Sequence, residues 1–65
     1  MEVRATTQDE LLILISRDEA GTINNALNEV CNGIHLSDSE FATRMGVTRA
    51  EAHDLLHAIN KALRA

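Results

Sequence analysis

A short pattern that starts α-helices occurs three times in this sequence: a Ser or Thr followed three residues later by a Glu. The three pairs are Ser16 with Glu19, Ser37 with Glu40, and Thr48 with Glu51. In such a capping box the hydroxyl accepts a hydrogen bond from a free amide of the first helical turn. The Glu carboxylate accepts one from the amide of the Ser or Thr. The chain is therefore expected to contain three helices that begin just after these residues.

Two glycines mark the ends of the first two helices. Gly33 and Gly46 each follow a helical pattern, and glycine readily takes the left-handed conformation that closes a helix. We expect helices at residues 17–32, 38–45 and 49–63, each with its apolar side chains on one face. The side chains expected to form one small core, together with one face of the N-terminal segment, are Ala20, Ile23, Leu27, Val30, Cys31, Ile34, Phe41, Met45, Val47, Ala52, Leu55, Leu56, Ile59 and Leu63.

The N-terminal segment has a different pattern. Residues 2–6 alternate weakly, residues 10–15 include the apolar run LLILI, and the polar sequence TQDE joins the two. This arrangement predicts a β-hairpin. The alternative is a helix that begins at Thr7, because Thr7 and Glu10 also have capping-box spacing. With the hairpin, the predicted fold is α+β and mainly α, in the order ββααα, within a single domain of residues 1–65.

The second strand would be apolar on both sides. Alternate residues of a strand point to opposite sides of the sheet. One side would carry Leu11, Ile13 and Ile15, and the other Leu12 and Leu14. Since two strands cannot cover both sides, we expect either an exposed apolar side or a second chain over it, such as the other subunit of a homodimer. In the helical alternative these residues would simply join the core.

Size and charge limit the functions open to this chain. A domain of 65 residues is marginally stable unless something supports its small core. The formal net charge of −4, from 6 basic and 10 acidic residues, disfavours general binding to nucleic-acid phosphates. The chain has no Trp or Tyr and a single Phe, so it lacks a platform for stacking bases.

The cellular compartment is indicated by three features. Cys31 is the only cysteine, which excludes an intramolecular disulfide and agrees with a reducing compartment. The N-terminus carries charged residues before its first apolar run, unlike a signal peptide. That run is also too short to cross a bilayer. We therefore expect a cytoplasmic protein without a membrane partner.

Residues 38–56, DSEFATRMGVTRAEAHDLL, resemble the bacterial helix-turn-helix. Ala42 lets the two helices approach, Gly46 forms the turn, and Val47 and Leu55 pack the pair. The match covers less than a third of the chain. Through NALNEVCNGI and EFATRMGVTRAEAHDLL the whole chain is also similar to short uncharacterised bacterial proteins, a resemblance that implies no chemistry.

The helix-turn-helix resemblance implies a dimeric DNA-binding regulator as one possible function. The nucleic-acid contacts that it implies are Arg44, Thr48, Arg49 and His53. The same helix, however, carries Glu51 and Asp54, which phosphates would repel, and few basic groups lie nearby. The segment also departs from the family at Ala52, where a branched aliphatic residue is usual. A tight αα-corner that only closes the core explains the segment better.

No catalytic or metal site is expected. Cys31, His35, His53 and His57 are of ligand type, but their spacing matches no standard zinc motif. Cys31 also lies on an apolar helical face, where a free cysteine behaves as a small hydrophobe. The hydroxyls and carboxylates that could act in catalysis are explained as helix caps. We therefore expect no enzymatic activity, no cofactor and no metal.

Asparagine is unusually frequent in the first predicted helix, at Asn24, Asn25 and Asn28, with Asn32 at its end. Asn costs about 0.6 kcal/mol per position relative to Ala, so the first three weaken the helix by roughly 1–2 kcal/mol. Their amides are suited to hydrogen bonding at an interface, with the hairpin or with a partner. A polar face that only keeps the protein soluble explains them equally well.

Together these features favour a small acidic protein-binding module that inhibits or regulates a larger protein with a basic surface. Acidic side chains would steer the encounter. Nuclease immunity proteins and phage anti-defence proteins have a comparable size and charge, which is an analogy only. The expected protein-binding residues are Asn24, Asn25, Asn28, Asp38, Glu40, Glu51 and Asp54.

Overall fold

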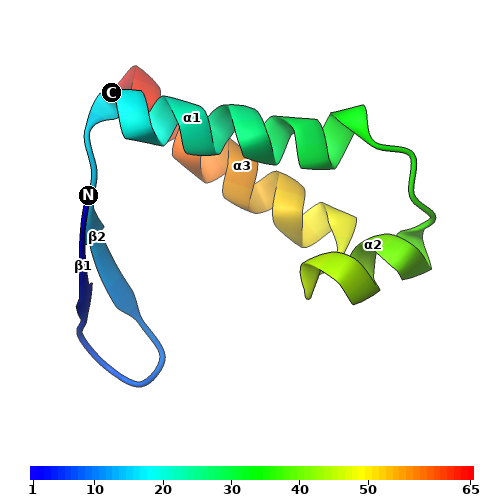
Figure 1. The fold of residues 1–65 in the computed structure, drawn as a ribbon, viewed down its shortest axis with the longest axis horizontal. Coiled ribbons are helices and arrows are strands. Elements are labelled where there is room, and N and C mark those ends of the chain that lie inside the picture. Colours follow the sequence, from blue (N-terminus) through cyan, green and yellow to red (C-terminus); the bar gives the residue numbers. More distant parts are fainter.

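A computed structural model describes all residues, 1–65, and confirms the predicted fold class: an antiparallel hairpin followed by three helices (Figure 1). A single π-helical turn, η1, extends the first helix. The elements are β1 (Glu2–Ala5), β2 (Leu11–Leu14), α1 (Arg17–Asn28), η1 (Glu29–Gly33), α2 (Asp38–Met45) and α3 (Arg49–Arg64). None of these helices is both long and apolar enough to span a membrane.

The helix starts follow the capping residues closely. Ser16, Ser37 and Thr48 are the N-caps, and each hydroxyl accepts a hydrogen bond from the amide three residues later, at 3.0, 3.1 and 3.2 Å. The reciprocal bond from the Glu carboxylate is present at Ser16 and Thr48. The box expected at Ser37 is only half formed, because its amide makes no bond to the Glu40 carboxylate.

The first helix does not end as expected. Its α-helical part stops at Asn28 and continues as the π-helical turn η1 up to Gly33. Gly46, with φ of 77°, is the one glycine in the left-handed conformation, so the prediction was right for Gly46 and wrong for Gly33. Within η1, Val30 is partly buried and Cys31 is buried, and both side chains lie at the core.

The core lies where η1, α2 and α3 meet. Its buried side chains are Cys31, Phe41, Ala52 and Leu56, surrounded by the partly buried Leu27, Val30, Leu36 and Met45. Helix α1 runs alongside α3, with its N-terminal end at the C-terminal end of α3 (Figure 1). The Arg17 guanidinium joins these ends by donating to the carbonyl oxygens of Leu63 and Ala65, both at 2.9 Å, a favourable place for a cation.

Several side chains expected in the core are exposed. Four of them lie on the helical body or its loops, and these are Ile23, Ile34, Val47 and Leu55, which are 38–55% exposed. Each satisfies the helical or flanking pattern, yet no facing element covers it. Helix α2 is only eight residues long and contacts α3 without reaching α1, so it covers a small area.

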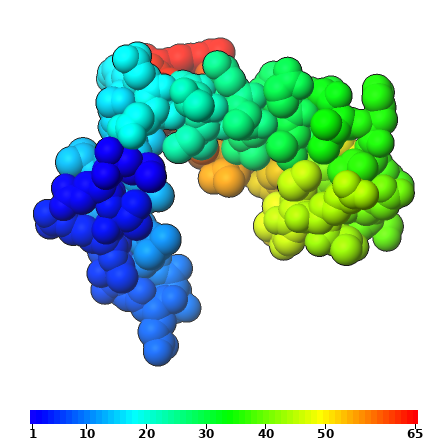
Figure 2. Space-filling view, viewed as in Figure 1, coloured from blue at the N-terminus to red at the C-terminus, as the bar shows by residue number.

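The hairpin stands apart from the helices. Its strands pair in one register, with Val3 opposite Ile13 and Ala5 opposite Leu11, but neither strand approaches any helix. Figures 1 and 2 show it as a separate lobe that projects from the N-terminal end of α1. The expectation that one hairpin face joins the core is therefore wrong, because α1 and α3 pack their apolar faces on each other instead.

The two glycines at Gly46 and Gly21 allow a matched test of the turn. An added Cβ would meet no neighbouring atom within 4 Å at either position. Gly46→Ala should lower the free energy of unfolding by about 1–2 kcal/mol, because alanine is strained at positive φ. Gly21→Ala, inside α1, should raise it by up to about 1 kcal/mol. Urea unfolding measures both changes, and equal changes of the same sign would contradict the left-handed turn.

Candidate protein-binding surface

The expected protein-binding residues do not form one patch. Three lie on α1, two on α2 and two on α3, and α1 makes no contact with α2. They therefore divide into an asparagine row on α1 and a set of carboxylates on the contacting helices α2 and α3. We call the second set the acidic surface, and its members are Asp38, Glu40, Glu51 and Asp54.

The asparagines on α1 and η1 have different surroundings. Asn28 and Asn32 are exposed and bonded to each other, with the Asn32 amide nitrogen donating to Asn28 Oδ1 at 2.9 Å. Asn25 is exposed. Asn24 is half-buried on the side of the helix that carries Ala20 and Leu27, and its Oδ1 is shielded from solvent without a hydrogen-bond partner. Of the three asparagines expected to bind a partner, Asn25 and Asn28 are therefore exposed, whereas Asn24 faces inward.

The carboxylates of the acidic surface differ in how many contacts they make within the chain. Glu51 completes the capping box, with its Oε1 accepting from the Thr48 amide at 3.1 Å. This bond, reinforced by the Thr48 side chain, lowers the pKa of Glu51 below its usual value. Asp38 lies 3.5 Å from Arg49 Nε but is 96% exposed at its side chain. Glu40 and Asp54 are exposed and make no side-chain bond within the chain.

Arg49, the central basic residue of the segment, is turned toward the core. Its guanidinium stacks on the Phe41 ring, with Cζ 4.5 Å from the ring centre. Its Nη2 donates to the Leu36 carbonyl oxygen at 2.6 Å. The guanidinium therefore ties α3 both to α2 and to the loop before it. Because Arg49 is held in these contacts, Arg44 is the exposed arginine of this region, which runs from α2 to the turn before the end of α3.

The residues expected for nucleic-acid binding also fall into two groups, one bonded within the chain and one exposed. The Thr48 hydroxyl caps α3, and the Arg49 guanidinium closes the core, so both are occupied. Arg44 and His53 are exposed, without a side-chain partner in the chain. The outward charge of α2 and the first half of α3 is therefore mainly negative.

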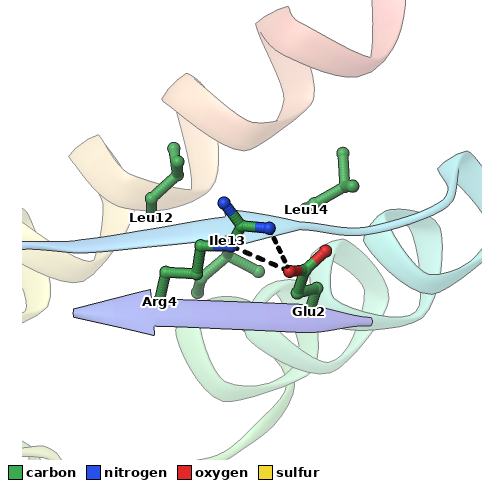
Figure 3. Close-up of a pocket in the computed structure, with 5 residues that line it drawn as sticks. All are labelled: Glu2, Arg4, Leu12, Ile13 and Leu14. Atoms are coloured by element: carbon green, nitrogen blue, oxygen red, sulfur yellow. Dashed lines mark hydrogen bonds and ion pairs between the residues drawn. The ribbon is translucent and has the colours of Figure 1, made fainter. Parts of the chain in front are cut away.

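The hairpin adds a surface that the expected site residues did not include. A shallow pocket of about 240 Å³ lies on it, lined by Glu2, Arg4, Leu12, Ile13 and Leu14. Figure 3 shows the Arg4 guanidinium paired with the Glu2 carboxylate, at 2.7 Å, beside Leu12 and Leu14, which point to the same side of β2. In the sequence, the alternation of sides along the strand already indicated that Leu12 and Leu14 share one side.

The residues of ligand type are not brought together. Cys31 is buried in the core, whereas His35, His53 and His57 are exposed. No group of three His, Cys, Asp or Glu side chains has the geometry to hold a metal ion. No family model, curated protein or solved structure matches the chain.

The shielded oxygen of Asn24 can be tested by replacement. Asn24→Leu keeps the shape of the side chain and removes an unpaired buried acceptor, so it should stabilise the protein by about 1 kcal/mol. Asn25→Leu is the matched control, because it changes helix propensity equally at an exposed position. Thermal unfolding compares the two, and a loss of stability in Asn24→Leu would show that the amide has a structural partner.

The inward role of Arg49 gives another matched pair. Arg49→Ala removes the contact with Phe41 and the bond to Leu36, and should lower the free energy of unfolding by roughly 1–2 kcal/mol. Arg44→Ala, at the exposed neighbour, should change it by less than about 0.5 kcal/mol. Urea unfolding measures both. Equal effects would mean that Arg49 is a surface group rather than part of the core.

Proposed function

We propose that this chain is a small acidic protein-binding module of the cytoplasm, which inhibits or regulates a larger protein with a basic surface. The observation that supports it is the division of charge on α2 and α3. Arg49 is turned inward onto Phe41, whereas Glu40 and Asp54 are exposed and unpaired. Such a surface attracts basic groups and repels phosphates.

The exposed groups suggest how contact would be made. Glu40 and Asp54 would steer the approach of a basic partner, because free carboxylates raise the rate of association with a complementary surface. Asp38 would join them by giving up its long contact with Arg49. Glu51 would contribute charge but little adaptability, since its carboxylate is held by the Thr48 amide. Asn25 and Asn28 would supply hydrogen bonds on α1.

The second candidate is a dimeric helix-turn-helix regulator that binds DNA. It is favoured by the left-handed Gly46, which lies in the short turn between α2 and α3. A phosphate-binding surface would then depend on Arg44, with His53 reaching toward base edges, since Thr48 and Arg49 already have partners in the chain. One exposed arginine provides little of the affinity that counterion release gives DNA-binding proteins.

The proposal is tested by reversing charge at the two free carboxylates. The tagged chain is used to capture a partner from lysate of its source cell, with and without nuclease. The affinity of the captured partner is then measured for the wild type and for the double variant Glu40→Lys with Asp54→Lys. The variant should bind the partner at least about tenfold more weakly than the wild type. The control is Asp9→Lys with Glu10→Lys in the hairpin turn, which makes the same change of net charge, from −4 to zero.

The outcomes separate the two candidates. A protein partner that survives nuclease, and is lost only in the α2–α3 variant, supports the binding module. Equal affinity of both variants would show that the acidic surface is not the contact. A nuclease-sensitive partner, with salt-dependent duplex binding that falls in Arg44→Ala, would instead support the DNA-binding regulator.

A further inference from the structure

One face of the hairpin is entirely apolar. Strand residues that are directly opposite share a face, so the pairs Val3 with Ile13 and Ala5 with Leu11 lie together. We call these four residues the apolar ribbon face. The other face carries the pairs Glu2 with Leu14 and Arg4 with Leu12, which include the ion pair of Figure 3.

Nothing within the chain covers the apolar ribbon face. Val3, Leu11 and Ile13 are 49–65% exposed, and no helix approaches either strand. A two-stranded hairpin is marginally stable in water unless its apolar side packs against something. Ile15, the residue after β2, lines an apolar groove with Ala20, Ile59 and Leu63 at the junction of α1 and α3. None of the four residues of the apolar ribbon face lines this groove, so it is a separate apolar region of the helical body.

The chain exposes more surface than a compact monomer of its mass. Its accessible surface is 5231 Å², whereas a compact monomer of 7.1 kDa exposes roughly 4,100 Å². The excess, on the order of 1,100 Å², is larger than the roughly 800 Å² that each partner buries in a standard interface, so the chain has enough surplus surface for one. The radius of gyration, 13.1 Å, likewise exceeds the roughly 10.7 Å expected for a compact chain of this length.

Charge indicates which partner fits this face. The four residues of the apolar ribbon face are uncharged, and the two charged residues of the strands, Glu2 and Arg4, neutralise each other at 2.7 Å. The net charge of −4 is therefore carried outside the strands. A second acidic copy of the chain is not repelled here, and a basic partner finds nothing to attract it.

From these observations we propose that the apolar ribbon face is the interface of a homodimer. The hairpins of two chains pack this face against its symmetry mate across a two-fold axis, so the same patch is buried on both protomers. The pairing closes after two copies, because the same patch is used up on both protomers. It goes beyond the proposed function, because the apolar ribbon face shares no residue with the acidic surface.

The test compares substitutions on the two faces of β2 in the full-length chain. Leu11→Lys with Ile13→Lys places two charges on the apolar ribbon face, and Leu12→Lys with Leu14→Lys places two on the other face. All four side chains are exposed in the single chain, at 49–69%, so neither variant disturbs the core of a protomer. Sedimentation equilibrium measures mass, and far-ultraviolet circular dichroism checks that the helices are retained.

The wild type is expected at twice the 7.1 kDa chain mass, and the Leu12 and Leu14 variant at the same doubled mass. The Leu11 and Ile13 variant is expected to return to the single mass with unchanged helix content. A monomeric wild type overturns the proposal, as do species larger than a dimer. It is also overturned if both variants dissociate or if both stay dimeric. Partner binding is not measured, so this result is independent of the test of the acidic surface.

Discussion

The contact between Arg49 and Phe41 is the interaction on which the helical body depends. Phe41 is the one side chain completely removed from solvent, and the Arg49 guanidinium lies over its ring while bonding the Leu36 carbonyl. Three segments, the loop before α2, α2 itself and α3, meet at this point. Because the core is so small, the Arg49 side chain helps to cover the Phe41 ring from solvent. The same contact holds Arg49 partly buried, at 28% side-chain exposure, so the exposed charges around it are mainly acidic.

The chain divides its apolar side chains between two places. The helices use theirs in a core of four buried residues, while the hairpin presents its own to solvent. A domain of this size has little surplus apolar surface, so leaving a ribbon uncovered is costly for an isolated monomer. A second copy that covers the ribbon would turn that cost into an interface.

The asparagines of α1 and η1 are not one functional unit. Asn28 and Asn32 bond to each other along the helix, as residues four apart can. Asn24 faces inward with its oxygen unpaired, and Asn25 is exposed. The polar row that looks uniform on a helical wheel therefore contains a local bond, a buried acceptor and a free amide. Only Asn25 is both exposed and without a side-chain hydrogen bond in the chain.

The sequence by itself determined the local features: the helix starts at Ser16, Ser37 and Thr48, the left-handed turn at Gly46, and the order ββααα. Each depends on hydrogen bonds or backbone preferences within a few residues, which a short pattern can encode. The tertiary structure alone decided that Arg49 turns inward, that Leu55 stays exposed and that the hairpin does not pack on the helical core. Those outcomes depend on which distant element lies opposite a given face. Periodicity identifies an apolar face, but only packing between distant segments decides what covers it.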